Sequence, residues 1–124
     1  MAGRTVKALS VRQPYASQIA RGEKLEEYRG RRTHHRGELL ICASKSPRLA
    51  GPDGLALPTG VAVALVEVVG CRETASGFAW VLDNIRPVQP FPVTGRLGIY
   101  EVTLPDELQL TGGPFRNPRA ARGH

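Results

Sequence analysis

The polar residues between positions 12 and 39 are the part of this sequence best suited to chemistry. Within six residues they include Lys24, Glu27 and Arg29. A lysine can bind phosphate as a point charge or, if partly desolvated, lose its proton and act as a base or nucleophile. A carboxylate at position 27 could accept a hydrogen bond from a base amino group or position Lys24. We expect the functional site here; an ordinary exposed turn lysine and a solvated strand face are the alternatives.

Residues around Pro14 add groups that could recognise a base. The amide of Gln13 can read a base edge, and the ring of Tyr15 can stack on one. Tyr15 also falls on the apolar stripe of the expected helix, so core packing is the slightly favoured alternative. Arg12 flanks the start of that helix, where unpaired N–H groups would suit an anion.

A basic loop over residues 30–36 could follow a phosphate backbone, although a solvated charged loop is the alternative. Adjacent His34 and His35 point apart as neighbours in an extended chain, so we expect no metal site. At the end of the following strand, Ser44 and Lys45 could form the edge of a cleft or simply a turn. The loop residues proposed for binding are Arg31, Arg32, His35 and Arg36.

The charge distribution supports an anionic partner. The net charge is +6, and residues 1–50 hold eleven Lys and Arg against four Asp and Glu, whereas residues 51–104 hold three against five. A basic field on one side of a candidate cleft is the electrostatic footprint expected for a phosphate-bearing ligand.

Hydrophobic patterning predicts the elements that must position these groups. Strands are expected at residues 5–11, 25–29, 38–44, 61–69, 78–88 and 97–104, with one short helix starting at Pro14 and ending at Gly22. The strand at 38–44 is apolar on both faces, which indicates that both faces are covered. Five or six strands and one helix predict an α+β fold built around a small, partly closed β-barrel.

Several residues outside the polar region have structural explanations. Glu67 interrupts an apolar strand, so it should pair with a partner such as Arg29 or point to water at an edge. Trp80 and Phe78 are expected in the core rather than as a stacking platform. Cys42 and Cys71 have no metal-binding spacing and are expected to be buried free thiols.

The chain is long enough for one domain, expected over residues 1–104, and the Pro-, Gly- and Arg-rich residues 105–124 are expected to form a flexible tail. No apolar run has membrane-spanning length, and no signal peptide precedes the first strand, so we expect a cytoplasmic protein. The sequence indicates no cofactor and no particular oligomeric state.

Three ordered motifs also carry a family resemblance. They are Gln-Pro-x-Ala at residues 13–16, Gly-x-Lys-x-x-Glu-x-Arg at 22–29 and His-Arg-Gly-x-Leu at 35–39, followed by a strand ending in Ala-Ser. With the ending at residues 92–100, the chain resembles the ASCH domain family of the PUA-like superfamily over roughly residues 4–104. The resemblance implies a pseudo-barrel with a helix beside a cleft.

The resemblance implies nucleic-acid binding, with RNA, as a single strand, nucleotide or base, expected before DNA. One alternative is a hydrolase acting on RNA or on N4-acetylcytidine through Lys24 and Glu27. In the amidohydrolase pattern a threonine follows the lysine by three residues and a glutamate lies beyond the next strand. Here Glu27 occupies the threonine position, and Glu73 matches the distant glutamate only loosely. A regulatory domain for a small nucleotide-like ligand is the remaining alternative.

Overall fold

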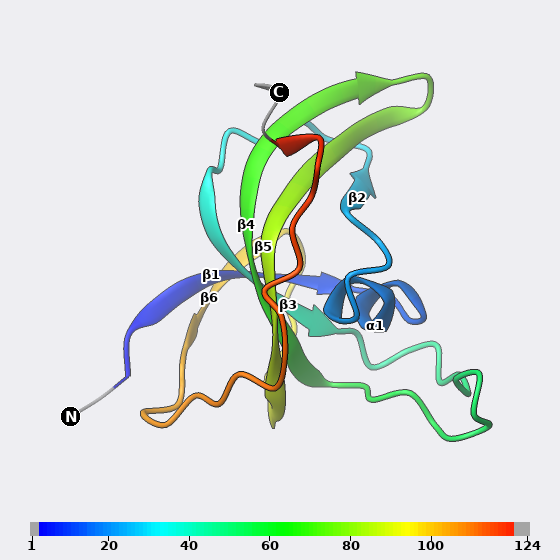
Figure 1. The fold of residues 1–124 in the computed structure, drawn as a ribbon, viewed down its shortest axis with the longest axis vertical. Coiled ribbons are helices and arrows are strands. Elements are labelled where there is room, and N and C mark those ends of the chain that lie inside the picture. Colours follow the sequence, from blue (N-terminus) through cyan, green and yellow to red (C-terminus); the bar gives the residue numbers. More distant parts are fainter. Residues whose placement is uncertain (1–2, 121–124) are drawn as a thin grey trace.

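The computed structural model describes residues 3–120, which form one curved six-stranded sheet with a short helix (Figure 1). The strands follow the order β2-β5-β4-β3-β1-β6, and only β1 and β3 run parallel. This half-barrel with one small helix confirms the expected fold class. The elements are β1 Thr5–Val11, α1 Tyr15–Ala20, β2 Glu26–Arg29, β3 Gly37–Ala43, β4 Val61–Thr74, β5 Gly77–Pro92 and β6 Ile99–Thr103.

Two apolar clusters occupy the two faces of the curved sheet. On one face, α1 inserts Ala16 and Ile19 into a core that includes Trp80, so the expected core role of Trp80 is confirmed. On the other face, Leu40 and Cys42 of β3 join a second cluster. Because side chains alternate along a strand, β3 supplies buried residues to both clusters, as its doubly apolar sequence predicts.

The β4–β5 hairpin is longer than the sequence predicts at both ends. The register shifts between β4 and β5 at three places, and such bulges let long strands bend (Figure 1). The sequence predicts a strand that ends at residue 88, because prolines interrupt the apolar pattern, yet β5 contains three prolines and continues to Pro92. Since β2 pairs with β5 only from Phe78 to Val81, the rest of β5 has one side without a long strand, where proline is tolerated.

Residues 105–120 differ from the expected flexible tail, because they lie along β5 (Figure 1). Isolated bridges join Leu110 to Val88 and Phe115 to Ile85, and Phe115 packs against the first core cluster. This short apolar anchor sits among Pro, Gly and Arg residues, so composition alone hides it. The last four residues of the expected tail, 121–124, lie outside the described residues.

The two cysteines are free, but only Cys42 is fully buried, and Cys71 is partly exposed. Burial raises the pKa of the Cys42 thiol to about 11. Cys42 is therefore protonated at neutral pH, as a packed core residue would be.

Among the described residues, no helix has the length and apolar character needed to cross a bilayer.

Candidate functional site

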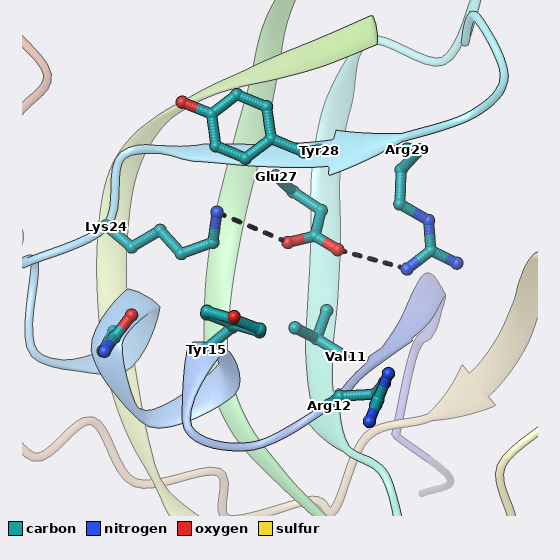
Figure 2. Close-up of a pocket in the computed structure, with 8 residues that line it drawn as sticks. Val11, Arg12, Tyr15, Lys24, Glu27, Tyr28 and Arg29 are labelled. Atoms are coloured by element: carbon teal, nitrogen blue, oxygen red, sulfur yellow. Dashed lines mark hydrogen bonds and ion pairs between the residues drawn. The ribbon is translucent and has the colours of Figure 1, made fainter. Parts of the chain in front are cut away.

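A cleft of about 560 Å³ opens between the C-terminal end of β1, the helix α1 and the strand β2 (Figure 2). Most of its lining belongs to the polar groups that the sequence singles out. The lining residues are Val11, Arg12, Tyr15, Gln18, Lys24, Glu27, Tyr28 and Arg29.

The turn after α1 delivers Lys24 to this cleft. Gly22 has a φ of +74°, the left-handed conformation that commonly ends a helix, and its N–H donates to the carbonyl of Ile19. The N–H groups of Glu23 and Lys24 both donate to the carbonyl of Gln18, which closes the turn. The expected stop at Gly22 is therefore observed, and the chain enters β2 two residues after Lys24.

The carboxylate of Glu27 lies between two cations at the centre of the cleft (Figure 2). Glu27 is only 6% exposed; its Oε2 accepts a 3.1 Å hydrogen bond from Arg29 Nη1, and its Oε1 lies 3.9 Å from Lys24 Nζ. Lys24 also donates to the carbonyl of Glu26 at 2.6 Å. Residues 27 and 29 share a face of β2 by strand alternation, as their spacing predicts.

Burial pushes both members of the Lys24–Glu27 pair towards their neutral forms. Desolvation lowers the pKa of Lys24, although the nearby carboxylates of Glu27 and Glu26 oppose this shift. Desolvation also raises the pKa of Glu27 against the hydrogen bond from Arg29 and the charges of Lys24 and Arg29. The fold thus holds ionisable groups where their charged forms are disfavoured, which is common at functional sites.

Two tyrosine rings lie at the cleft, one on each side of the Lys24 ammonium group. Tyr15 is 50% exposed and Tyr28 is 59% exposed. Lys24 Nζ lies 5.5 Å from the Tyr15 ring centroid and 4.3 Å from that of Tyr28. The core role favoured for Tyr15 is therefore wrong. The sequence did not single out Tyr28, because strand alternation with Glu27 predicts that it faces the other side of β2, and no local signal places it at the cleft.

Gln13 was expected at the cleft, but the structure places it outside the lining. It is only 2% exposed, and its amide is fully engaged: Nε2 donates to Ser17 Oγ and to the carbonyl of Pro58, while Oε1 accepts from the Ser17 N–H. Gln13 instead ties α1 to the loop that contains Pro58. The same bonds correct the expected anion site at the helix start, since the Ser17 N–H is already paired and Ala16 donates to the Arg12 carbonyl.

The other residues expected to bind lie outside this cleft. Arg31 lines a neighbouring cavity, and the Arg32 guanidinium lies 4.9 Å from the Phe78 ring centroid. Arg36 donates to two backbone carbonyls of its own loop. The remaining three residues, His35, Ser44 and Lys45, are absent from the cleft lining. His35 Nε2 contacts the Glu38 carbonyl, and the Ser44 N–H donates to the Val11 carbonyl. Lys45 is exposed and lies beside Gly60.

Two acidic residues do not take the suggested roles. Arg29 bonds to Glu27 and to the carbonyl of Ser10, whereas Glu67 accepts from Asn84 Nδ2 at 3.2 Å. Arg29 is thus not the partner of Glu67. Glu73 is exposed near the β4–β5 turn and does not line the cleft, so its loose match to a catalytic glutamate has no support from its position.

Asn117 is a buried polar residue that holds the segment preceding β2, and the sequence did not single it out. It is 5% exposed, and its Nδ2 donates to the carbonyls of Leu82 and Leu25 at 2.9 and 3.3 Å. Its backbone N–H donates to Asp83 Oδ1, and its Oδ1 accepts from the Arg119 N–H. Asn117 therefore joins the C-terminal segment to β5 and to the residue that precedes β2.

The comparison with known protein families agrees with the fold and with the motifs in this cleft. A family model of the ASCH domain matches residues 9–102, and the chain belongs to the ASCH family. The match includes the end of β1 from Leu9 and all of α1 and β2, and therefore every lining residue of the cleft, but it ends before Asn117. A comparison with curated proteins finds no match. Within residues 3–120, no three His, Cys, Asp or Glu side chains group as metal ligands.

Proposed function

We propose that this ASCH domain binds single-stranded RNA and holds one unstacked base in the cleft beside Glu27. The observation that carries the proposal is the buried Glu27 carboxylate, held between Lys24 and Arg29 and flanked by two exposed tyrosine rings. Membership of the ASCH family supports a nucleic-acid-binding role in general.

The site supplies both kinds of contact that an extruded base requires. Tyr15 and Tyr28 offer ring faces for stacking, a contact worth about 1–3 kcal/mol per base in single-strand binding. A carboxylate has about four acceptor positions, so Glu27 can accept from a base amino group while it remains bonded to Arg29. Cytosine and adenine carry such an amino group.

Lys24 and the exposed Arg12 would provide the contacts to phosphate. Replacing Lys24 with alanine should weaken RNA binding and lower the slope of log affinity against log salt by about 0.7, the value expected for one lost contact to a single strand. Fluorescence anisotropy of a labelled heptanucleotide at several salt concentrations measures both quantities. Lys7→Ala is the matched control, because Lys7 is exposed on β1, pairs with Glu101 and lies outside the cleft.

An equal loss of affinity in the two lysine variants would show that net charge alone drives binding, and the cleft would lose its assigned role. Absence of any salt slope in the wild-type protein would contradict the proposal entirely. Single-stranded DNA of the same sequence provides a second arm, and tighter binding of DNA would reassign the ligand.

The lowered pKa of Lys24 favours one second candidate, hydrolysis of N4-acetylcytidine in RNA with Lys24 as base or nucleophile. We expect mass spectrometry of an RNA carrying one N4-acetylcytidine to show loss of the acetyl group with wild-type protein and none with Lys24→Ala. An unchanged RNA mass in both samples would remove this candidate and leave binding alone. Cleavage of the RNA chain would instead indicate a ribonuclease.

A further inference from the structure

A second cavity adjoins the cleft on the other side of Arg29. Its volume is about 540 Å³, and Arg29 is the one lining residue that it shares with the cleft. Both volumes lie in the range of about 300–1,000 Å³ that is usual for small-molecule sites. The cavity is lined by Leu9, Arg29, Gly30, Arg31, Trp80, Leu97 and Gly98.

Arg29 forms the partition between the two cavities. Its side chain reaches from β2 to β1, where Nη1 donates to the carbonyl of Ser10 at 3.4 Å. Val11 lines the cleft, and Leu9 lines the second cavity. Residues two apart in a strand face the same side and lie about 7 Å from each other. The cavities therefore follow one another along the same face of β1, with Arg29 crossing between them.

The second cavity has the chemical character of a nucleotide site. Among the described residues, its charged lining consists of Arg29 and Arg31, with no carboxylate. Leu97 is 99% exposed, which leaves an apolar surface available to a base. Trp80 Nε1 donates to the carbonyl of Arg31 at 2.9 Å and so anchors the backbone beside the arginine side chain.

Arg29 retains donors for a ligand that spans the partition. Both of its hydrogen bonds, to Glu27 and to Ser10, use Nη1. Figure 2 shows the other terminal nitrogen turned away from Glu27. Guanidinium groups present several N–H donors in a fixed plane, a geometry that suits phosphate.

We infer that the two cavities bind consecutive nucleotides of one strand, with the phosphate that links them over Arg29. This inference rests on the proposed function, because it requires RNA in the cleft. It makes a dinucleotide the smallest complete ligand, and it assigns Arg31 and Leu97 to a second nucleotide subsite.

Calorimetric titration with cytidine 5′-monophosphate and with a 5′-phosphorylated dinucleotide tests the inference. We expect the dinucleotide to bind about tenfold more tightly, a gain of about 1.4 kcal/mol. Arg31→Ala and Leu97→Ser should each remove most of this gain and leave the affinity for the mononucleotide within about twofold. Arg48→Ala, which removes an exposed arginine outside both cavities, should change neither affinity.

The failures of the two proposals give different results. Equal affinities for mononucleotide and dinucleotide would overturn the second subsite and leave the base-binding cleft in place. An equal effect of Arg31→Ala on both ligands would also overturn it, since the residue would then act only through net charge. No binding of either ligand, or of the longer RNA, would overturn the proposed function as well. Thermal unfolding of each variant checks that the exposed substitutions leave the fold intact.

Discussion

Replacing Asn117 with alanine should lower the free energy of unfolding by about 2–3 kcal/mol, because it removes the three hydrogen bonds of a buried amide side chain. The side chain bonds to Leu82, Leu25 and the Arg119 N–H in a site from which water is largely excluded. The bonds to Leu82 and Leu25 link residues far apart in sequence, whereas the bond to Arg119 is local. The loss should also loosen β2, since Leu25 precedes its first residue.

Urea denaturation with an unchanged m value measures this effect as a lower midpoint. Gln109→Ala is the matched control, because Gln109 is an exposed amide on the same C-terminal segment whose backbone carbonyl, not its side chain, pairs with Gln89. We expect its free energy of unfolding to stay within about 0.5 kcal/mol of wild type. If Asn117→Ala were equally mild, the C-terminal segment would not hold the sheet, and the flexible tail expected from the sequence would be the better description.

Replacing Glu27 with glutamine should reduce the ratio of affinities for amino-bearing over keto-bearing bases about tenfold. One well-paired base contact contributes about 1–3 kcal/mol of such discrimination. The carboxylate only accepts hydrogen bonds, whereas glutamine also donates and therefore tolerates a uracil oxygen. Anisotropy titrations with oligonucleotides that differ by one cytosine or uracil measure this preference. Glu101→Gln, an exposed carboxylate on β6 outside the cleft, serves as the control. An unchanged preference in Glu27→Gln would exclude base reading by this carboxylate.

The same preference should fade at acidic pH in the wild-type protein. Burial raises the pKa of Glu27 above the ordinary value of 4.5, so protonation starts at a higher pH than for an exposed glutamate. A protonated carboxyl carries an O–H donor and can then donate a hydrogen bond to the keto oxygen of a base such as uracil. We expect the pH dependence to disappear in Glu27→Gln, and its persistence there would assign the titration to another group.

The two shifted pKa values also fix the sign of their effect on stability. For Glu27 the folded protein binds more protons than the unfolded chain between 4.5 and the raised pKa, so stability from this group falls as pH rises through that window. For Lys24 the unfolded chain binds more protons than the folded protein between the lowered pKa and 10.5, so stability from this group increases as pH rises through that window. At neutral pH both charged forms oppose folding. Glu27→Gln should therefore not lower the urea midpoint at pH 7, in contrast to Asn117→Ala.

Local sequence signals predicted most of the framework. The left-handed turn at Gly22 ends α1 as expected, and the doubly apolar β3 is buried on both faces. Such features depend on residues close together in the chain, through backbone conformation and side-chain periodicity. The sequence did not predict where the β4–β5 hairpin ends. A strand can contain proline where no neighbouring strand needs its N–H group, and which parts of β5 have such a neighbour is a property of the assembled sheet.

The sequence by itself determined the ASCH family, the α+β half-barrel and the three ionisable residues that meet in the cleft, since the spacing of Lys24, Glu27 and Arg29 places them on one turn and one strand face. Only the tertiary structure decided which other side chains are available to a ligand. It buries Gln13 against a distant loop, exposes Tyr15 and fastens the C-terminal segment through Asn117. The physical reason is that burial and hydrogen-bond pairing are set by contacts between distant segments, which residue type and local spacing do not encode.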